Sequence, residues 1–425
     1  MPAHNPAPFL TSVRAVQAVG EDWSAAARAL ADALGRAGDA DTLGRAGDAD
    51  TLGRAGDGAA LGFLYATDTL ADDLGSVVTF LRQRTGIEHW IGGTGIGIFS
   101  GRAPATDREY FEAPALVALV VSFAGAEGDA EGAPGEAGAF SVFTLGLDGV
   151  AAPALPADAL PADTMTAFIH ADPMNEDTPD AIAQLAAAGP GFLIGGLTSA
   201  RDRNVQIADG IAEAVLSGVA FAPGVQLATG LTQGCVPVGK AHRVSEVDGN
   251  ILQGLDGVSA LDALKADLGE EFAGDVDNDM DNDMENVAGL VHMGIPVPGS
   301  DTGDFTVRAL AGIDPSRGWL LIGEAVEVGD SIFFVRRDGR SAEIDMIHML
   351  ENLKHRTLDA GQKIKGAVYI SCIARGPAMF DEPGREMALI RDVLGDFPLA
   401  GFYASGEISA SRLYGYTGVL TLFVE

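Results

Sequence analysis

The chain has 425 residues, of which 47% are hydrophobic and 20% are charged, an ordinary globular composition with room for two or three buried cores. Its formal net charge of −33 argues against nucleic acid and anionic membranes as partners, because both require a basic surface. Two cysteines cannot form a disulfide framework. No secretory signal and no apolar run of about 18 residues is recognisable, so we expect a cytoplasmic protein.

The N-terminal part begins with apolar residues at helical spacing, which predict an amphipathic helix at 21–34. A perfect nine-residue repeat starts at Gly35, and its polar, glycine-rich composition predicts an expanded surface loop over 35–57. A second repeat makes an acidic loop insert at 273–286. Its register does not place glycine and glutamate where an EF-hand requires them, so we predict a solvated loop there and no calcium site.

Along the rest of the chain, strands outnumber helices and often follow one another directly, especially from 190 to 335. Predicted strands lie at 60–66, 90–99, 115–123, 139–147, 165–171, 191–199, 213–221, 224–231, 287–297, 304–312, 319–324, 331–336, 365–373, 398–408 and 416–424. Predicted helices lie at 69–85, 178–188, 258–268, 340–357 and 383–395. This order predicts an α+β fold with mixed and antiparallel sheets. Without a Pro/Ser-rich linker, we expect two closely packed αβ modules, 1–220 and 221–425.

A glycine-bearing strand motif occurs three times, in Trp90–Ile98, Phe192–Ser199 and Leu399–Ile408. Each copy begins as an apolar run, passes through glycine and reaches a small hydroxyl residue or another glycine. Glycine inside a strand marks a bulge or a close approach of backbone or ligand. The motif therefore predicts a repeated αβ module whose strand ends converge on one or more pockets. Tight corners without a ligand are the alternative.

The common enzyme signatures are absent from the sequence. The glycines of Gly92–Gly97 do not fit the dinucleotide pattern, and a β-like segment follows them where a helix should start. No Walker A segment, H-E-x-x-H, C-x-x-C or G-x-S-x-G motif is present. His348, Glu351 and His355 share one helix face, but that face lies opposite the apolar stripe, so we predict no metal site.

Cys372, Arg375 and Glu407 are the candidate chemical groups near the C-terminus. A guanidinium lowers the pKa of a nearby thiol, but a nucleophile also needs a base, and no histidine lies locally. Arg375 could clamp a carboxylate through two hydrogen bonds while Glu407 accepts from an ammonium group, which suits an amino-acid zwitterion. Alternatively, Arg375 and Glu407 pair with each other and hold two strands together.

Several segments together, in this order and spacing, resemble the FIST family, a sensory module of bacterial signal transduction that also occurs in some F-box proteins. The resemblance runs from about Pro8 to the C-terminus. The segments that carry it are Ala25–Leu34, Gly62–Ala66, Trp90–Gly97, Phe192–Ala200, Thr232–Gly239, Asp248–Leu252, Leu255–Gly257, Ser371–Gly376 and Pro398–Ile408. It implies an N-type FIST domain over 1–220 and a C-type FIST domain over 221–425.

The resemblance implies a sensor that binds a small molecule without transforming it, with amino acids suggested as ligands. The strand ends of the glycine motifs would line its pocket. The candidate ligand-binding residues are Gly92, Gly93, Thr94, Gly195, Gly196, Thr198, Cys372, Arg375, Gly401, Tyr403, Ser405 and Glu407. The family-like region takes up nearly the whole chain, so we expect the output to pass in trans through a signalling partner such as a histidine kinase.

Three alternatives stay open. Some bacterial family members bind haem and sense nitric oxide together with a histidine kinase; the candidate axial ligands here are His89, His170, His242 and Cys235, and none carries a haem signature. An enzyme using Cys372 or an unrecognised site is the second alternative. A pure interaction scaffold is the third, as the F-box relatives suggest. The sequence leaves the ligand, the partner and the oligomeric state open.

Overall fold

The computed structural model describes residues 9–40, 59–124, 138–146, 164, 166–188, 191–269, 291–297, 305–380 and 382–425. The acidic insert at 273–286 lies outside these residues, and so does the expanded loop beyond residue 40. Helix α1 (Trp23–Ala40) is longer than predicted and takes in the first residues of the nine-residue repeat. The predicted end at residue 34 is therefore wrong, because Gly35 and Gly38, which disfavour helix, do not end it.

The chain forms two compact units. The larger unit contains residues 1–232, 346–413 and 417–425, and the smaller contains residues 233–345 and 414–416. Because the chain returns to the larger unit after residue 345, no single cut in the sequence separates the two. The predicted boundary between the modules 1–220 and 221–425, near Phe221, therefore stays a prediction.

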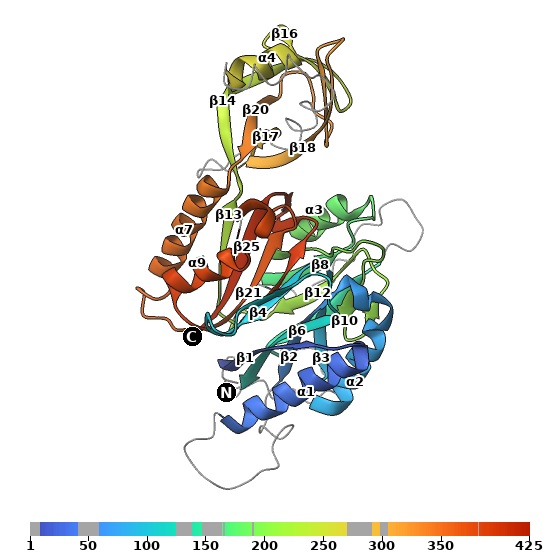
Figure 1. Cartoon of the computed structure of the whole chain (residues 1–425), viewed down its shortest axis with the longest axis vertical. Coiled ribbons are helices and arrows are strands. Elements are labelled where there is room, and N and C mark those ends of the chain that lie inside the picture. The colour runs from blue at the N-terminus through green and yellow to red at the C-terminus, as the bar shows by residue number, and fades with distance from the viewer. Residues whose placement is uncertain are drawn as a thin grey trace, which may run out of the picture. The chain divides into compact units, whose positions relative to one another are not determined.

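The larger unit contains three six-stranded sheets (Figure 1). The first sheet has, in spatial order, β1 (Phe9–Val19), β6 (Ala115–Ala124), β2 (Ala60–Thr67), β3 (His89–Gly95), β10 (Gln206–Ala208) and β11 (Ile211–Ala212). The second has β7 (Phe140–Leu145), β12 (Leu216–Phe221), β8 (Thr166–Ala171), β9 (Phe192–Leu197), β23 (Glu407–Ser409) and β24 (Arg412–Tyr414). The third has β13 (Leu227–Gln233), β25 (Thr417–Val424), β21 (Ile364–Cys372), β22 (Leu399–Ala404), β4 (Ile98–Gly101) and β5 (Arg108–Tyr110).

Each sheet is built around one parallel pair of strands: β2 with β3, β8 with β9, and β21 with β22. Parallel neighbours need a long crossover, and helices provide it here. The crossovers are η1 (Asp68–Asp73) with α2 (Leu74–Thr85), then α3 (Thr178–Ala188), then α8 (Pro377–Phe380) with α9 (Arg385–Leu394). A later strand, β6, β12 or β25, then pairs antiparallel with the first strand of its pair. These three repeats confirm the repeated αβ module that the glycine motifs predict.

The short hairpin that follows each parallel pair joins the sheet of a different repeat. Strand β4 of the first repeat pairs with β22, strand β10 of the second pairs with β3, and strand β23 of the third pairs with β9. The exchange is therefore cyclic and ties the three repeats into one unit. It also corrects the predicted strands at 90–99 and 398–408, since each is two strands that belong to different sheets.

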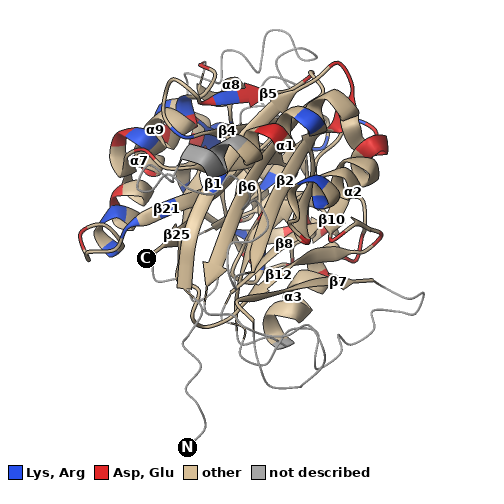
Figure 2. Cartoon of the chain, turned by 90° about the horizontal axis from the view of Figure 1, so that it is seen from below, with Lys and Arg blue, Asp and Glu red and all other residues tan. Residues whose placement is uncertain are grey.

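The inner faces of the three sheets share one hydrophobic core. The ring of Phe63 lies 5.2 Å from that of Phe168 and 5.9 Å from that of Phe423, and the three residues come from three different sheets. On the outside, α1 and α2 cover the first sheet, while α9 and the buried side of α7 (Gly339–Arg356) cover the third. Figure 2 shows charged residues on these helices and few on the strands between them.

The smaller unit contains one seven-stranded sheet with helix α4 (Ala260–Leu268). The strands, in spatial order, are β14 (Cys235–Asp248), β20 (Ser331–Arg337), β17 (Val291–Pro296), β18 (Phe305–Asp314), β19 (Trp319–Ile322), β15 (Ile251–Leu255) and β16 (Val258–Ser259). Its neighbouring strands are antiparallel. Together with the mixed sheets of the larger unit, this confirms the α+β class.

Two long strands, β1 and β14, are absent from the sequence-based prediction. In β14 eight of the 14 residues are exposed, and in β1 three of the 11 residues are buried while most of the others are partly exposed. Neither contains the continuous apolar run on which the prediction depended. By contrast, α3 occupies the predicted range, 178–188, because its apolar residues follow helical spacing without interruption.

Candidate functional site

The glycine motifs occupy the same position in each repeat. Gly92, Gly195 and Gly401 lie in register with Leu64, Ile169 and Tyr369 of the neighbouring parallel strand. A Cβ atom at these glycines would lie 1.9, 1.8 and 1.8 Å, respectively, from the carbonyl oxygen of that partner. The close approach of two backbones therefore requires these glycines. These glycines allow the two parallel strands to lie close together, and the need for glycine here does not depend on a ligand.

The neighbouring motif residues form the junctions between repeats. A Cβ atom at Gly93 would lie 2.4 Å from the carbonyl oxygen of Val205, and one at Gly196 would lie 2.9 Å from a methyl group of Ile370. The hydroxyl of Thr94 accepts a hydrogen bond of 3.0 Å from the backbone N–H of Val205. These three predicted site residues therefore hold one repeat against the next.

The strand ends of the three repeats converge around Ser199, which is fully buried. Its hydroxyl accepts a hydrogen bond of 2.9 Å from the N–H of Ile96 and donates one to the carbonyl of Tyr403. The N–H of Ser405 donates to the carbonyl of Leu197 at 3.2 Å. The predicted convergence is present, but Ser199 was not among the predicted residues. Its position in the second motif, next to Thr198, was the available clue.

Arg375 lies in a buried polar cluster with Glu386. Its Nε donates to Glu386 Oε1 at 2.9 Å, and its side chain also covers the ring of Phe380. Tyr369 and Ser371 donate to the two oxygens of Glu386 at 2.6 and 2.8 Å. Burial works against the charge of Arg375, but the carboxylate of Glu386 outweighs it and raises the arginine pKa. Arg375 thus has an internal counter-ion, which the sequence did not identify.

Glu407, the other half of the expected zwitterion clamp, is also fully buried. Its Oε2 accepts from the N–H and the hydroxyl of Thr417 at 3.1 and 2.7 Å. Burial raises the pKa of Glu407 to about 8, although the bonds from Thr417 and the charge of Arg375 oppose the shift. Glu407 therefore interacts with Arg375 through space, and Arg375 forms its ion pair with Glu386.

Cys372 and Tyr403 lie near the same buried cluster. Cys372 is 6% exposed and contributes a hydrogen bond to Glu407. The hydroxyl of Tyr403 donates to Glu109 Oε1 at 2.7 Å, and burial raises the pKa of that carboxyl. Ser405, in contrast, is exposed. The structure thus brings Cys372, Arg375, Tyr403 and Glu407 together but encloses them within the protein.

A cleft of about 410 Å³ lies at the carboxyl ends of β8 and β9. We call it the Asp172 cleft, and the polar residues that line it are Asp172, Asn175, Thr198, Arg203, Asn204, Gln206 and Glu213. Of the predicted ligand-binding residues, Thr198 is the one in its lining. Ligands of open sheets that contain parallel strands commonly bind beyond the carboxyl ends of those strands, so the position is typical of a binding site.

The polar groups of the Asp172 cleft differ in how far the protein satisfies them. Gln206 donates to the carbonyl of Ala214 at 2.9 Å and accepts from the Ser217 hydroxyl at 2.7 Å. Asn204 Oδ1 is buried without a hydrogen-bond partner. A buried acceptor without a partner is costly, so a donor on a bound molecule would relieve it.

The three histidines among the candidate haem ligands each contact protein groups. His89 Nδ1 lies 2.9 Å from Asp209, whose hydrogen bond raises the histidine pKa. The two ring nitrogens of His242 lie 3.0 and 2.7 Å from Asp256 and Asp267.

His170 is fully buried, with Nε2 at 3.3 Å from the hydroxyl of Tyr65 and its ring among aromatic rings, and burial lowers its pKa to about 3. Cys235 packs against Phe305 and Val335 in a small apolar cluster. An axial ligand needs a free donor atom beside a flat apolar slot. His170 Nδ1 has no hydrogen-bond partner, but its ring is fully buried against those of Tyr65, Phe168 and Phe402. The described residues around these positions therefore do not fit a haem.

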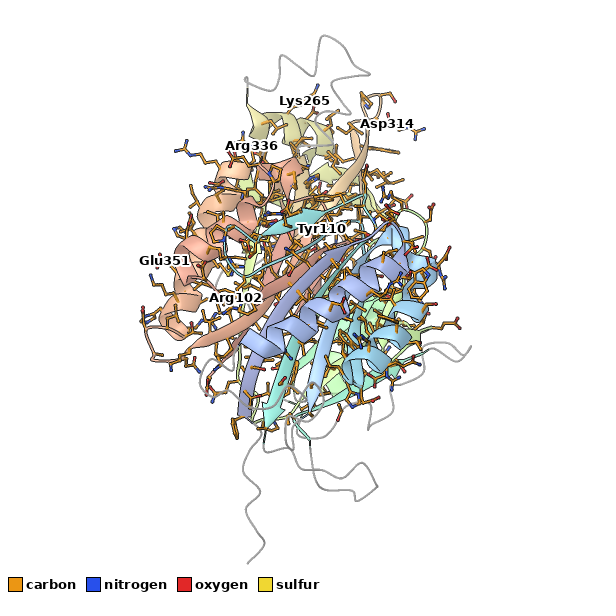
Figure 3. The ribbon with its side chains drawn as sticks, turned by 60° about the horizontal axis from the view of Figure 1, so that its bottom comes forward. Arg102, Tyr110, Lys265, Asp314, Arg336 and Glu351 are labelled. Carbon is orange, nitrogen blue, oxygen red and sulfur yellow. The ribbon has the colours of Figure 1, made fainter. Side chains whose placement is uncertain are left out.

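Two further findings concern metals and membranes. On α7, His348, Glu351 and His355 are exposed, and Figure 3 shows Glu351 pointing away from the helix. Within the described residues, no three His, Cys, Asp or Glu side chains are grouped as a metal site would need. None of the helices in that part of the chain combines the length and the apolar character that crossing a membrane requires.

Comparison with known proteins gives two family matches. A model described as the FIST N domain matches residues 60–258, and one described as the FIST C domain matches residues 260–410. An uncharacterized protein of Mycobacterium tuberculosis strain H37Rv is 33% identical over 207 residues, which are 48% of this chain and 52% of the relative. An uncharacterized protein of Mycobacterium bovis is 32% identical, with the same shares of the two chains covered. The chain spans about half the length of these curated relatives.

Proposed function

Because this chain belongs to the FIST family, whose domains mark sensory modules of signal transduction, we propose that it senses a small polar molecule in the Asp172 cleft. The observation that supports this proposal most directly is Asn204 Oδ1, a buried acceptor without a partner in the lining of the cleft. The cleft lies beyond the carboxyl ends of the parallel strands β8 and β9, and this position also supports binding there.

The lining favours a ligand with an amino group. Asp172, Glu213 and Asn204 Oδ1 offer acceptors. Arg203 Nη1 already donates to the exposed Asp72 at 2.9 Å, and the remaining N–H groups of its guanidinium can bind a ligand carboxylate. One cation and two carboxylates in a cleft of about 410 Å³ suit an amino acid better than a phosphate or a sugar. We therefore propose that the ligand is an amino acid. The support for this class comes from the residues that line the Asp172 cleft, and Arg375 and Glu407 are not part of it.

The output of the sensor is proposed to pass through a protein partner in trans, such as a histidine kinase. In the described residues, the thiol of Cys372 is 6% exposed and bonds to Glu407, so the enzyme alternative gains no support from it. A cytoplasmic location remains a prediction from the sequence.

A calorimetric screen of the purified chain against single amino acids tests the proposal. We expect saturable binding by the wild type and a loss of about tenfold or more in Asn204→Leu, since the ligand loses one hydrogen bond in a buried site. Asn352→Leu, on the exposed face of α7, is the matched control and should bind as the wild type does. Absence of binding to the wild type, or equal binding by the folded Asn204→Leu variant, would overturn it.

A further inference from the structure

The charges in the lining of the Asp172 cleft do not balance. The lining contains two carboxylates, Asp172 and Glu213, and one guanidinium, Arg203. Arg203 already pairs with Asp72 at 2.9 Å, whereas neither Asp172 nor Glu213 forms an ion pair within the described residues. The segment 147–163, which follows the lining residue Gly146 in the chain, contains aspartates but no lysine or arginine. The described lining therefore has an excess of negative charge.

Exposure divides this lining into an outer and an inner part. Arg203 and Glu213 are exposed, which places them at the mouth of the cleft. Asp172 is partly buried at the end of β8, and Asn204 Oδ1 is buried without a hydrogen-bond partner. The outer part thus holds one charge of each sign, while the inner part holds a carboxylate and an unused acceptor.

The backbone fixes the orientation of the Asp172 carboxylate. The N–H of Met174 donates to Asp172 Oδ1 at 2.8 Å, and the N–H of Asp172 itself donates to the carbonyl of Val215 at 3.2 Å. No hydrogen bond within the described residues uses Oδ2, so that oxygen can accept from a ligand. A carboxylate that is held in place before binding loses little freedom when a cation arrives.

From these observations we infer that the Asp172 cleft selects an amino acid with a positively charged side chain, such as lysine or ornithine. The inference rests on the proposed function of the cleft as an amino-acid site. At the mouth, Arg203 binds the α-carboxylate and Glu213 accepts from the α-ammonium group. The side chain extends inwards, where its ammonium group donates to Asp172 Oδ2 and Asn204 Oδ1. A neutral side chain would leave both acceptors without a donor, which disfavours its binding.

A divalent metal ion fits these residues less well than an organic cation. Calcium takes about six to eight oxygen ligands, and the two carboxylates of the lining belong to different parts of the cleft. In the part of the chain that the structure describes, no three His, Cys, Asp or Glu side chains are grouped. The volume of about 410 Å³ lies in the range of small-molecule sites.

Calorimetric titration of the full chain with lysine and with norleucine tests the inference, because norleucine has the same carbon chain and lacks only the side-chain ammonium group. We expect lysine to bind about tenfold or more tightly, the effect of one charge-assisted hydrogen bond. Cadaverine, which lacks the α-carboxylate, should bind more weakly than lysine because it cannot pair with Arg203.

Two variants that each remove one negative charge separate the two parts of the cleft. Asp172→Asn keeps the acceptor for the Met174 N–H and should bring the lysine affinity down to about that of norleucine. Glu213→Gln should weaken both ligands to a similar extent. Glu176→Gln, an exposed carboxylate in the turn after β8 and outside the lining, is the matched control and should keep the preference for lysine.

The outcomes distinguish this inference from the proposed function. Equal affinities of lysine and norleucine for the wild type would overturn the inference and leave the amino-acid site intact. A full preference for lysine in the folded Asp172→Asn variant, or cadaverine binding as tightly as lysine, would also overturn it. Absence of binding by every amino acid would overturn both.

Discussion

Arg375 and Glu386 form an ion pair inside the larger unit, with 2.9 Å between Nε and Oε1 and side chains that are 0% and 3% exposed. Both charges are removed from water, so each depends on the other for its stabilisation. The sequence left open whether Arg375 and Glu407 bind a ligand together or pair with each other, and the observed partner of Arg375 is Glu386 of helix α9. This geometry assigns the arginine a structural role.

The first prediction follows from that burial. Glu386→Gln leaves the Arg375 charge without a counter-ion and should lower the free energy of unfolding by about 3–5 kcal/mol. Urea denaturation followed by circular dichroism measures the change. Asp72→Asn, which breaks the exposed pair of Arg203 with Asp72, is the control and should cost at most about 1 kcal/mol. Similar small effects in both variants would contradict a buried charge pair.

The second prediction concerns the glycines that face a carbonyl of the parallel neighbour. Gly195→Ala should destabilise the protein by about 1–3 kcal/mol or more, because its φ of +148° is unfavourable for alanine and the methyl group meets the carbonyl of Ile169. Gly210→Ala is the matched control, with no atom within 4 Å of the added methyl group. Thermal melts compare the two, and equal melting temperatures would contradict the close-approach explanation.

The third prediction uses the buried carboxyl of Glu407, whose pKa is raised from 4.5 to about 8. Above the unfolded pKa, the folded state holds a proton that the unfolded state has released, so stability falls as pH rises through this window. The slope from one proton is at most about 1.4 kcal/mol per pH unit. Glu407→Gln should remove this slope between pH 5 and about 8, whereas Glu351→Gln should keep it. If the stability of Glu407→Gln changed with pH as that of the wild type does, the pH dependence would not come from Glu407.

The fourth prediction concerns acid stability and His170, whose pKa burial lowers from 6.5 to about 3. Below pH 6.5 the unfolded chain binds a proton that the folded chain does not, so stability falls as pH decreases towards 3. His170→Gln should flatten this part of the profile while still offering a partner to the Tyr65 hydroxyl. His355→Gln, an exposed histidine, should leave it unchanged. Chemical denaturation at a series of pH values separates the two outcomes.

The candidate site was predictable only in part. The motif ending in Thr198 and Ser199 pointed to a strand end, and Thr198 does line the Asp172 cleft. Arg203 and Asn204 follow it in the chain, but no local pattern distinguishes them from ordinary loop residues. Asp172 ends a strand of the same repeat, and its proximity depends on the parallel pairing of β8 with β9. Sequence spacing alone does not give that pairing.

Local spacing and residue type were enough to predict the α+β class, most helices, the repetition of a glycine-bearing strand and the family. Tertiary structure alone decided which strands are neighbours. The cyclic exchange of β4, β10 and β23 joins residues more than a hundred positions apart, and no local propensity encodes such long-range pairing. The parallel pairing of β8 with β9 likewise places Asp172 and Thr198 in one cleft.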